Sequence, residues 1–283
     1  MKRNNKTNFN LTPDNVRAGI EFFKETGQPF DVIVQTYTTR INGAGNTFLF
    51  MNKGQSNAMF AAYKKILADV KKFDDIFGDL VPDIKNPSYN ENKINKEVFY
   101  PAVNNFDIKS AYLNALHTTG IISTATRDYC NNLTKPDRLA CVGMLASKKN
   151  IFHYNEDGNL EGHSIERAEF SKYFFWAVNY IGEAMTDLMR MIELKDIFLF
   201  YWVDGIYCVS KQPENLFLDY VRATLTRDYG LEYTAEKLSA FKIVKKENKF
   251  ELTYLKEGKQ KRFQFSANND VDKLKQQILN SLK

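Results

Sequence analysis

Hydrophobic positions recur with two different periods in this chain, and the first of these periods predicts helices. Between residues 55 and 72 apolar side chains return every three or four positions, which is typical of one face of an amphipathic helix. Thr12 followed by Pro13 predicts an earlier helix start, with the threonine as cap and the proline in the first turn. This first helix should stop near Gly27.

The second period predicts strands. Residues 31–40 and 47–51 are rich in strand-forming side chains, and residues 43–46 predict the turn between them. A stretch rich in proline and asparagine, residues 79–96, then interrupts the pattern and is typical of a domain boundary. We therefore expect residues 1–95 to form a small N-terminal α+β segment, whose role the pattern does not indicate.

Strands and helices are both expected in the rest of the chain. The strands are expected at residues 98–107, 198–209 and 241–265, and the helices at residues 110–116, 136–149, 164–194, 213–229 and 271–282. The last group of strands includes a hairpin across Glu257 and Gly258. We expect a core over residues 96–240, followed by a basic C-terminal hairpin and helix over residues 241–283.

Two aspartates stand where the strongest strand patterns end. Asp107 closes the strand that begins near Val98, and Asp204 with Gly205 interrupts the apolar run of residues 198–209. Carboxylates that share a pair of magnesium ions must be held together on rigid elements and remain open to substrate, and strand ends in one sheet meet both conditions. Simpler interpretations also exist, because Asp-Gly is a hairpin signal and an aspartate can cap a following helix.

Composition excludes several classes of protein. The chain has 283 residues, is 43% hydrophobic and carries a net charge of +5, which is compatible with a globular domain or two and with a polyanionic partner. The three cysteines and three histidines have no metal-ligand spacing, so no structural zinc is expected, and sparse cysteines favour the reducing cytoplasm. The longest apolar stretch, residues 173–192, is interrupted by charges, so no membrane span is expected.

Three segments occur in the order of the motifs of family B DNA polymerases. Residues 107–113 (DIKSAYL) resemble motif A, DxxSLYP. Residues 138–148 (RLACVGMLASK) resemble motif B, KxxxNSxYG, and residues 201–207 (YWVDGIY) resemble motif C, YxDTDS. The resemblance covers roughly residues 98–250. It implies an α+β fold with a polymerase-palm-like antiparallel sheet and helices on one face of that sheet.

The resemblance also implies a template-directed nucleotidyltransferase. Asp107 and Asp204 would be catalytic and would hold Mg²⁺ or Mn²⁺. The residues implied to bind the incoming nucleotide are Ser110, Ala111, Tyr112 and Arg138. The Tyr112 ring would stack below the sugar, and the Arg138 guanidinium would take the place of the family's triphosphate-binding lysine. The implied partners are a DNA primer-template, deoxynucleoside triphosphates and a priming or replication protein, in a phage or mobile element and without a membrane.

The chain also departs from the family pattern. Trp202 stands in the place of the first aspartate of motif C, and Leu113 replaces the proline of motif A. The residues that replace the asparagine, serine, tyrosine and glycine of motif B are Val142, Gly143, Leu145 and Ala146. These changes remove side chains that position the nucleotide and the template base in the family. No set of exonuclease acids precedes Asp107, so we expect no proofreading.

Lysines outside the motifs are candidates for contacts with nucleic acid. The five that we expect to contact DNA are Lys148, Lys149, Lys245, Lys246 and Lys249. The first two stand at the expected end of the helix over residues 136–149, and the others belong to a basic stretch over residues 242–262 in which lysines alternate with aromatic residues. Backbone contacts of this kind would be sensitive to salt. A solvated helix end and a half-buried hairpin are the alternative explanations.

Two other functions fit the same residues. The departures in motifs B and C favour a degenerate palm that binds DNA or a replication protein without catalysis. A metal-dependent nuclease would need additional acids beside Asp107 and Asp204. The acids that could join them are Glu166, Glu169, Glu183 and Asp187, which are expected along the helix over residues 164–194.

Overall fold

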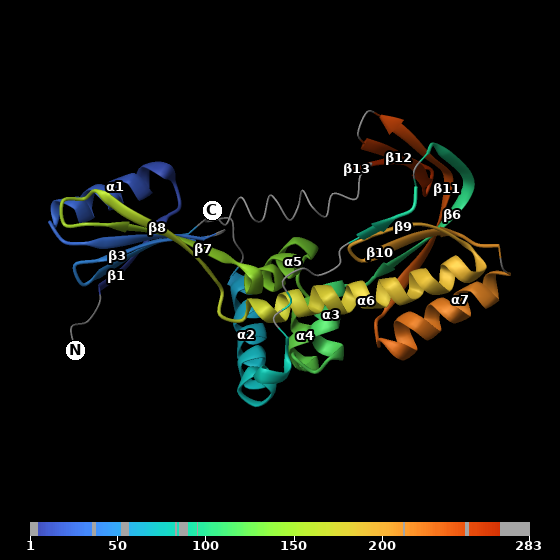
Figure 1. The fold of residues 1–283 in the computed structure, drawn as a ribbon. Coiled ribbons are helices and arrows are strands. Elements are labelled where there is room, and N and C mark those ends of the chain that lie inside the picture. Colours follow the sequence, from blue (N-terminus) through green and yellow to red (C-terminus); the bar gives the residue numbers. More distant parts are fainter. Residues whose placement is uncertain are drawn as a thin grey trace. The chain divides into compact units, whose positions relative to one another are not determined.

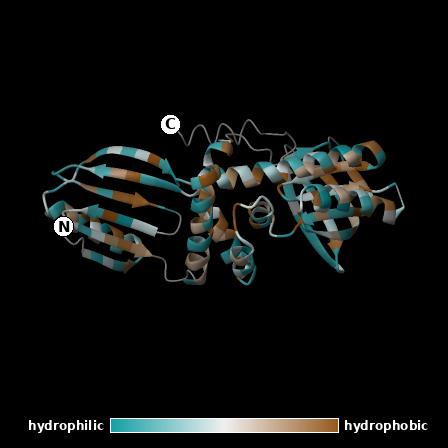
Figure 2. Ribbon diagram, turned by 90° about the horizontal axis from the view of Figure 1, so that it is seen from below, coloured by the Kyte–Doolittle hydropathy of each residue, from teal (hydrophilic) through white to brown (hydrophobic). Residues whose placement is uncertain are grey.

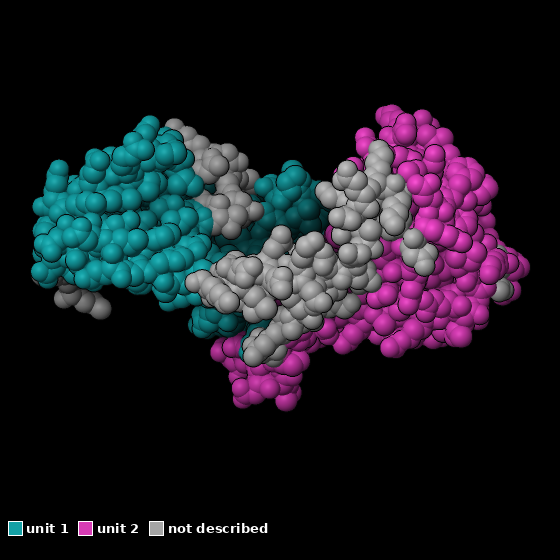
Figure 3. Space-filling model, turned by 45° about the horizontal axis from the view of Figure 1, so that its top comes forward, with its two compact units in different colours: residues 1–72, 128–174 teal, residues 73–127, 175–283 magenta. Residues whose placement is uncertain are grey.

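The chain folds into two compact units, each built from two stretches of sequence (Figure 3). The computed structural model describes residues 5–35, 38–51, 57–82, 84, 90–94, 96–211, 213–246 and 249–266. The first unit contains residues 1–72 and 128–174, and the second contains residues 73–127 and 175–283. These units follow other boundaries than the expected segments 1–95, 96–240 and 241–283, because residues 128–174 join the N-terminal sheet.

The sheet of the first unit has the strand order β1-β4-β3-β2-β7-β8. Its strands are β1 (Asn5–Asn10), β2 (Phe30–Val34), β3 (Thr38–Gly43), β4 (Asn46–Met51), β7 (Lys148–Tyr154) and β8 (Leu160–Arg167). The expected strand over residues 31–40 is therefore two strands. β1 pairs with β4 in parallel and the other pairs are antiparallel. The strands show the alternation of apolar and polar residues that one buried face requires (Figure 2).

Helix α1 (Pro13–Glu25) begins as predicted, because the Thr12 hydroxyl accepts a hydrogen bond from the Asn15 N–H at 3.2 Å. Its buried Phe23 packs beside Phe30 of β2, with the ring centroids 5.7 Å apart. The other helices are α2 (Asn57–Phe77), α3 (Ala111–Thr118), α4 (Thr124–Asn131), α5 (Lys135–Gly143), α6 (Ser171–Lys195) and α7 (Glu214–Arg222). No helix in the described part of the chain has the length and apolarity needed to cross a bilayer.

Two predicted helices are present, but one of the two bounds of each is wrong. The helix expected over residues 136–149 ends at Gly143, and the helix expected from residue 164 begins at Ser171. The residues between them form the hairpin of β7 and β8, whose loop closes with a hydrogen bond from the Asn155 N–H to the Asn159 carbonyl at 3.0 Å. β7 also pairs with the edge of β2, so backbone hydrogen bonds from a distant segment decide the structure here.

The sheet of the second unit is antiparallel throughout, with the strand order β13-β12-β11-β6-β10-β9-β5. Its strands are β5 (Asn90–Asn92), β6 (Val98–Ile108), β9 (Ile197–Trp202), β10 (Gly205–Val209), β11 (Tyr233–Lys246), β12 (Lys249–Lys256) and β13 (Lys259–Ser266). Helices α6 and α7 lie against one face (Figure 1). Phe106 of β6 meets Phe217 of α7 on that face, with centroids 5.4 Å apart. The expected α+β class and antiparallel sheet with helices on one face are thus confirmed.

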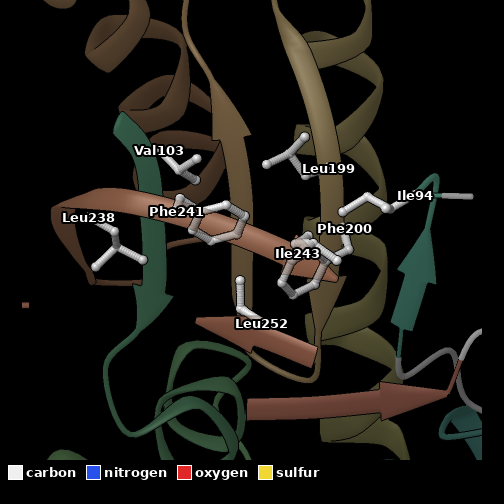
Figure 4. Close-up of a cluster of buried hydrophobic side chains, with 8 residues drawn as sticks. All are labelled: Ile94, Val103, Leu199, Phe200, Leu238, Phe241, Ile243 and Leu252. Atoms are coloured by element: carbon white, nitrogen blue, oxygen red, sulfur yellow. The ribbon is translucent and has the colours of Figure 1, made fainter. Parts of the chain in front are cut away.

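An apolar cluster from β6, β9, β11 and β12 fills the core on the other side of the sheet (Figure 4). Its buried members are Ile94, Val103, Leu199, Phe200, Leu238, Phe241, Ile243 and Leu252. The predicted hairpin across Glu257 and Gly258 joins β12 to β13, and both residues have positive φ, as a tight hairpin turn needs. α7 continues as a π-helical turn over residues 223–228, and the helix expected over residues 271–282 lies outside the described residues.

Candidate active site

The pairing of β6 with β10 brings the two predicted aspartates together. Asp107 is the penultimate residue of β6, and its partner across the sheet is Gly205, the first residue of β10. The Ile108 N–H also donates to the Asp204 carbonyl oxygen at 2.9 Å. The two residues are 97 positions apart in sequence (204 − 107 = 97) but extend from adjacent positions at one end of one sheet. Asp107 is exposed and Asp204 is half-buried, so neither is sealed in the interior.

Asp204 belongs to the turn between β9 and β10. Trp202 pairs with Gly205, so the turn consists of Val203 and Asp204 rather than of the predicted Asp204 and Gly205. Val203 has a φ of 58°, which a β-branched residue rarely adopts. Such a conformation costs about 1–3 kcal/mol and persists only where the surrounding structure enforces it. The strain therefore lies directly beside one of the two carboxylates.

The residues that follow Asp107 turn the chain from β6 into α3. Ser110 takes the N-cap position in a left-handed conformation, with a φ of 44° and no hydrogen bond from its side chain to the helix. Ala111 is buried and Tyr112 is half-buried in the first turn of α3. Asp107 therefore stands on the strand, three residues before the cap, and the predicted nucleotide-binding residues Ser110, Ala111 and Tyr112 lie next to it in the same unit.

Negative charge gathers around one phenol near the aspartates. Burial raises the pKa of Tyr207 of β10 above the ordinary value of a tyrosine. The groups whose charges raise this pKa further are Tyr254, Asp107, Glu236 and Asp204. Glu236 of β11 is itself paired with the Lys256 ammonium at 2.7 Å. Both aspartates therefore lie within electrostatic range of the same phenol.

The donor set suits a hard divalent cation. The glycine at position 205 lets β10 approach Asp107 closely, since a Cβ built on it would stand 3.3 Å from the Asp107 Oδ1 atom. Mg²⁺ prefers oxygen ligands and is commonly bound by one or two carboxylates together with water and substrate phosphates. Within the described ranges, no group of three or more His, Cys, Asp or Glu side chains gathers as a metal site. Two carboxylates as oxygen ligands fit Mg²⁺ or Mn²⁺.

The structure does not bring all predicted residues into one unit. Arg138 lies on α5 in the first unit, where its Nη1 donates to the Asn131 carbonyl at 3.3 Å. Lys148 and Lys149 also belong to the first unit and lie on β7, so the expectation that they end a helix is wrong.

The three predicted DNA-binding lysines of the second unit lie on one hairpin. The backbones of Lys245 and Lys246 on β11 pair with Phe250 and Lys249 on β12. The side chains of these lysines lie outside the described parts of the structure. Their contact with DNA therefore stays a prediction.

The acids considered for a nuclease were expected along one helix, but they do not share a helix. Glu166 lies on β8 and Glu169 lies in the segment between β8 and α6. Glu183 and Asp187 lie on α6, where Asp187 accepts a hydrogen bond from the Tyr229 hydroxyl at 2.6 Å. Asp187 therefore has a packing role within the second unit.

One residue of the site, Asn105, has no place in the sequence motifs. It precedes Asp107 by two positions on β6, so strand alternation directs both side chains to the same face of the sheet. Asn105 is 8% exposed, and its Oδ1 atom is buried without a hydrogen-bond partner among the described residues. A buried polar atom left without a partner costs about 1–3 kcal/mol. The alternation of side chains along the strand that contains Asp107 is the sequence signal that could have identified Asn105.

Comparison of the sequence with known proteins does not identify a family. No protein-family model matches the chain, and no curated protein matches it. The resemblance of residues 107–113, 138–148 and 201–207 to polymerase motifs therefore stays a prediction. The structure shows that Asp107 and Asp204 converge at one end of an antiparallel sheet.

Proposed function

We propose that this chain is a template-directed nucleotidyltransferase, which adds deoxynucleotides to a 3′-hydroxyl with the help of Mg²⁺ or Mn²⁺ and resembles the palm of family B DNA polymerases. The observation that carries the proposal is the pairing of Asp107 with Gly205, which places Asp107 and Asp204, from distant segments, at adjacent positions at one end of the sheet. Both carboxylates reach the protein surface, as ligands that must share an ion with a substrate phosphate have to do.

In this proposal Asp107 and Asp204 hold the divalent ions. When bound, the ions would supply charge neutralisation at the phosphates and a lowered pKa of the attacking hydroxyl. The turn from β6 into α3 presents backbone N–H groups beside Asp107, which is a suitable position for the triphosphate of the incoming nucleotide. Tyr112 in the first turn of α3 would border the sugar. Arg138 would bind the triphosphate, a role that rests on the resemblance to motif B alone.

The proposed partners are a DNA primer-template, deoxynucleoside triphosphates and a priming or replication protein. A net charge of +5 favours a polyanion, and Lys148, Lys149 and the lysines of the β11–β12 hairpin would contact its backbone. All three cysteines are free and buried, which suits a reducing compartment such as the cytoplasm of a host cell. We place the activity in the replication of a phage or mobile element by analogy with the family.

Primer extension tests the proposal. The purified chain is incubated with a labelled primer-template, all four deoxynucleoside triphosphates and Mg²⁺ or Mn²⁺. The wild-type chain should extend the primer, and Asp204→Asn should reduce the rate by about 10³-fold or more, because a lost ligand removes several kcal/mol of transition-state stabilisation.

The matched control is Asp219→Asn, which changes an exposed carboxylate on α7 in the same unit. This variant should extend the primer at the wild-type rate. Extension that survives in Asp204→Asn would show that Asp204 is not a ligand. Release of nucleotides from a labelled strand without added triphosphates would instead favour a nuclease.

A second candidate function is a binding module without catalysis. Trp202 stands where the family has its first motif C aspartate and is 43% exposed beside the turn. An exposed indole can stack on a base of single-stranded DNA, which is worth about 1–3 kcal/mol per base. If the wild-type chain binds labelled single strands but extends nothing, and Trp202→Ala weakens binding about tenfold or more, the binding module is the better description.

A further inference from the structure

Asn105 lies inside the candidate site and is not explained by packing. Its partners across the sheet are Tyr207 on β10 and Glu236 on β11, so it occupies a central position in β6. The side chain is more than nine-tenths buried, and its Oδ1 atom has no hydrogen-bond partner among the described residues. An apolar side chain of the same shape would fill this position without leaving an oxygen unsatisfied.

The orphan oxygen faces the same space as the Asp107 carboxylate. A Cβ built on Gly205 would stand 3.3 Å from the Asp107 Oδ1 atom and 3.7 Å from the Asn105 Oδ1 atom. The two oxygens therefore flank one point above Gly205, and the absence of a side chain there keeps the point open. Asp204 directly precedes Gly205 in the chain, so all three residues lie at or beside the start of β10.

We infer that the Asn105 amide oxygen is a third protein ligand of the divalent cation that Asp107 and Asp204 hold, an inference that rests on the metal site of the proposed function. An amide oxygen is a hard, neutral ligand that Mg²⁺ and Mn²⁺ accept beside carboxylates. The cation enters from the exposed Asp107 side and reaches the Asn105 oxygen on its inner side. Because the oxygen is shielded from solvent, water does not compete for that coordination position.

Titration with Mn²⁺ alone tests this inference without any measurement of enzyme activity. Binding of Mn²⁺ to the full chain is followed by electron paramagnetic resonance and by calorimetry. Asn105→Leu has a similar volume but no oxygen, and it should weaken Mn²⁺ binding about tenfold or more. The same variant without metal should melt at the wild-type temperature or above it, because the unsatisfied oxygen is gone.

The matched control is Asn104→Leu, one position earlier on β6 and directed to the other face of the sheet. It should bind Mn²⁺ as tightly as the wild type. A purely structural role for Asn105 gives the opposite pattern, in which Asn105→Leu loses thermal stability and keeps its Mn²⁺ affinity. That pattern overturns the inference.

A second pair of variants covers the case in which Asn105→Leu does not fold. Asn105→Asp adds a carboxylate at the proposed ligand position and should tighten Mn²⁺ binding about tenfold, whereas Asn104→Asp should have a smaller effect from charge alone. Equal effects of the two substitutions overturn the inference.

Failure of the metal site and failure of the ligand assignment give different results. If Mn²⁺ binding is the same in the wild type and in Asp204→Asn, the metal site itself is refuted and the inference fails with it. If Asp204→Asn abolishes binding and Asn105→Leu does not change it, only the role of Asn105 is refuted. If Mn²⁺ binding depends on Asp204 and Asn105 but primers are not extended, the ligand assignment stands and the proposed reaction is wrong.

Discussion

Acidic residues have different partners in the sheets of the two units. In the first unit Asp31 on β2 pairs with the His153 Nδ1 atom on β7 at 2.8 Å, and the His153 Nε2 atom lies 3.2 Å from the Ser164 hydroxyl on β8. In the second unit the charges of Asp107 and Asp204 act together on one half-buried phenol, that of Tyr207. Asp31 of the first sheet is thus paired with a histidine, whereas Asp107 and Asp204 lie near one another at one end of the second sheet. Elsewhere in the second sheet acids do pair with cations, as Glu236 does with Lys256.

Under the proposed function, this difference separates a sheet that serves stability from one that serves chemistry. Complementary pairs across strands contribute about 0.2–1 kcal/mol each, and like charges opposite one another are destabilising. Val203 adds backbone strain at the same end of the second sheet, and Asn105 adds an unsatisfied oxygen. A concentration of local costs in one place is typical of a functional site. The comparison therefore supports the proposed site at the start of β10.

The largest loss of primer extension is expected when either or both aspartates of the second sheet are substituted. Asp107→Asn and Asp204→Asn should each reduce primer extension by about 10³-fold, and the double variant should be little worse than either, because residues that hold the same ion act as a unit. Rates of single-nucleotide addition measure this. Asp31→Asn removes the corresponding acid of the first sheet and should not change the rate. Losses that multiply in the double variant would mean that the two acids act separately.

A smaller effect is expected from filling the space above Gly205. Gly205→Ala places a methyl group 3.3 Å from the Asp107 Oδ1 atom, which must move by a few tenths of an ångström. Such misplacement should reduce primer extension on the order of 10- to 100-fold. The control is Gly162→Ala on β8, where the nearest atom, on His153, lies 3.7 Å from the new Cβ. Equal activity of the two alanine variants would contradict a site built around this space.

The smallest effect concerns a carboxylate with a structural role. Asp196 is 7% exposed and accepts hydrogen bonds from the Tyr220 hydroxyl, the Ser210 hydroxyl and the Lys211 N–H. Tyr220→Phe should therefore lower the free energy of unfolding by about 1.5 kcal/mol, as measured by urea denaturation. The control is Tyr154→Phe in the first unit, whose hydroxyl has no hydrogen bond in the described part of the structure and whose ring stacks on Phe30.

The pH dependence of this pair has a definite sign. Burial, and then Asp196, raise the pKa of Tyr220, so the folded state keeps a proton that the unfolded state loses above pH about 10. The stabilisation is present below that pH and is lost as the pH rises further. The stability difference between the wild type and Tyr220→Phe should shrink in alkaline solution. A difference that stays constant to high pH would contradict the proposed bond.

The positions of the two aspartates at strand ends could be predicted from the sequence, because the strand pattern around each aspartate is local. The apolar runs before Asp107 and around Asp204 predict strands by themselves, and hairpin geometry limits where the second aspartate can lie. The β7–β8 hairpin was missed, although Asp157 and Gly158 lie in the loop between two strand-like runs and are a recognised turn signal. Its structure depends on the edge of β2, which is remote in sequence, and no local period describes such a partner.

The division of each unit into two stretches of sequence has a consequence for how the chain is made. β2 ends at Val34, but its neighbour β7 spans Lys148–Tyr154, so the first sheet remains incomplete on the ribosome until both segments have emerged. A fragment that stops at residue 95 would expose the unpaired edge of β2, and such exposed strand edges promote aggregation. Truncation within the first unit is therefore expected to reduce solubility, whereas circular permutation would keep β2 and β7 in the same chain.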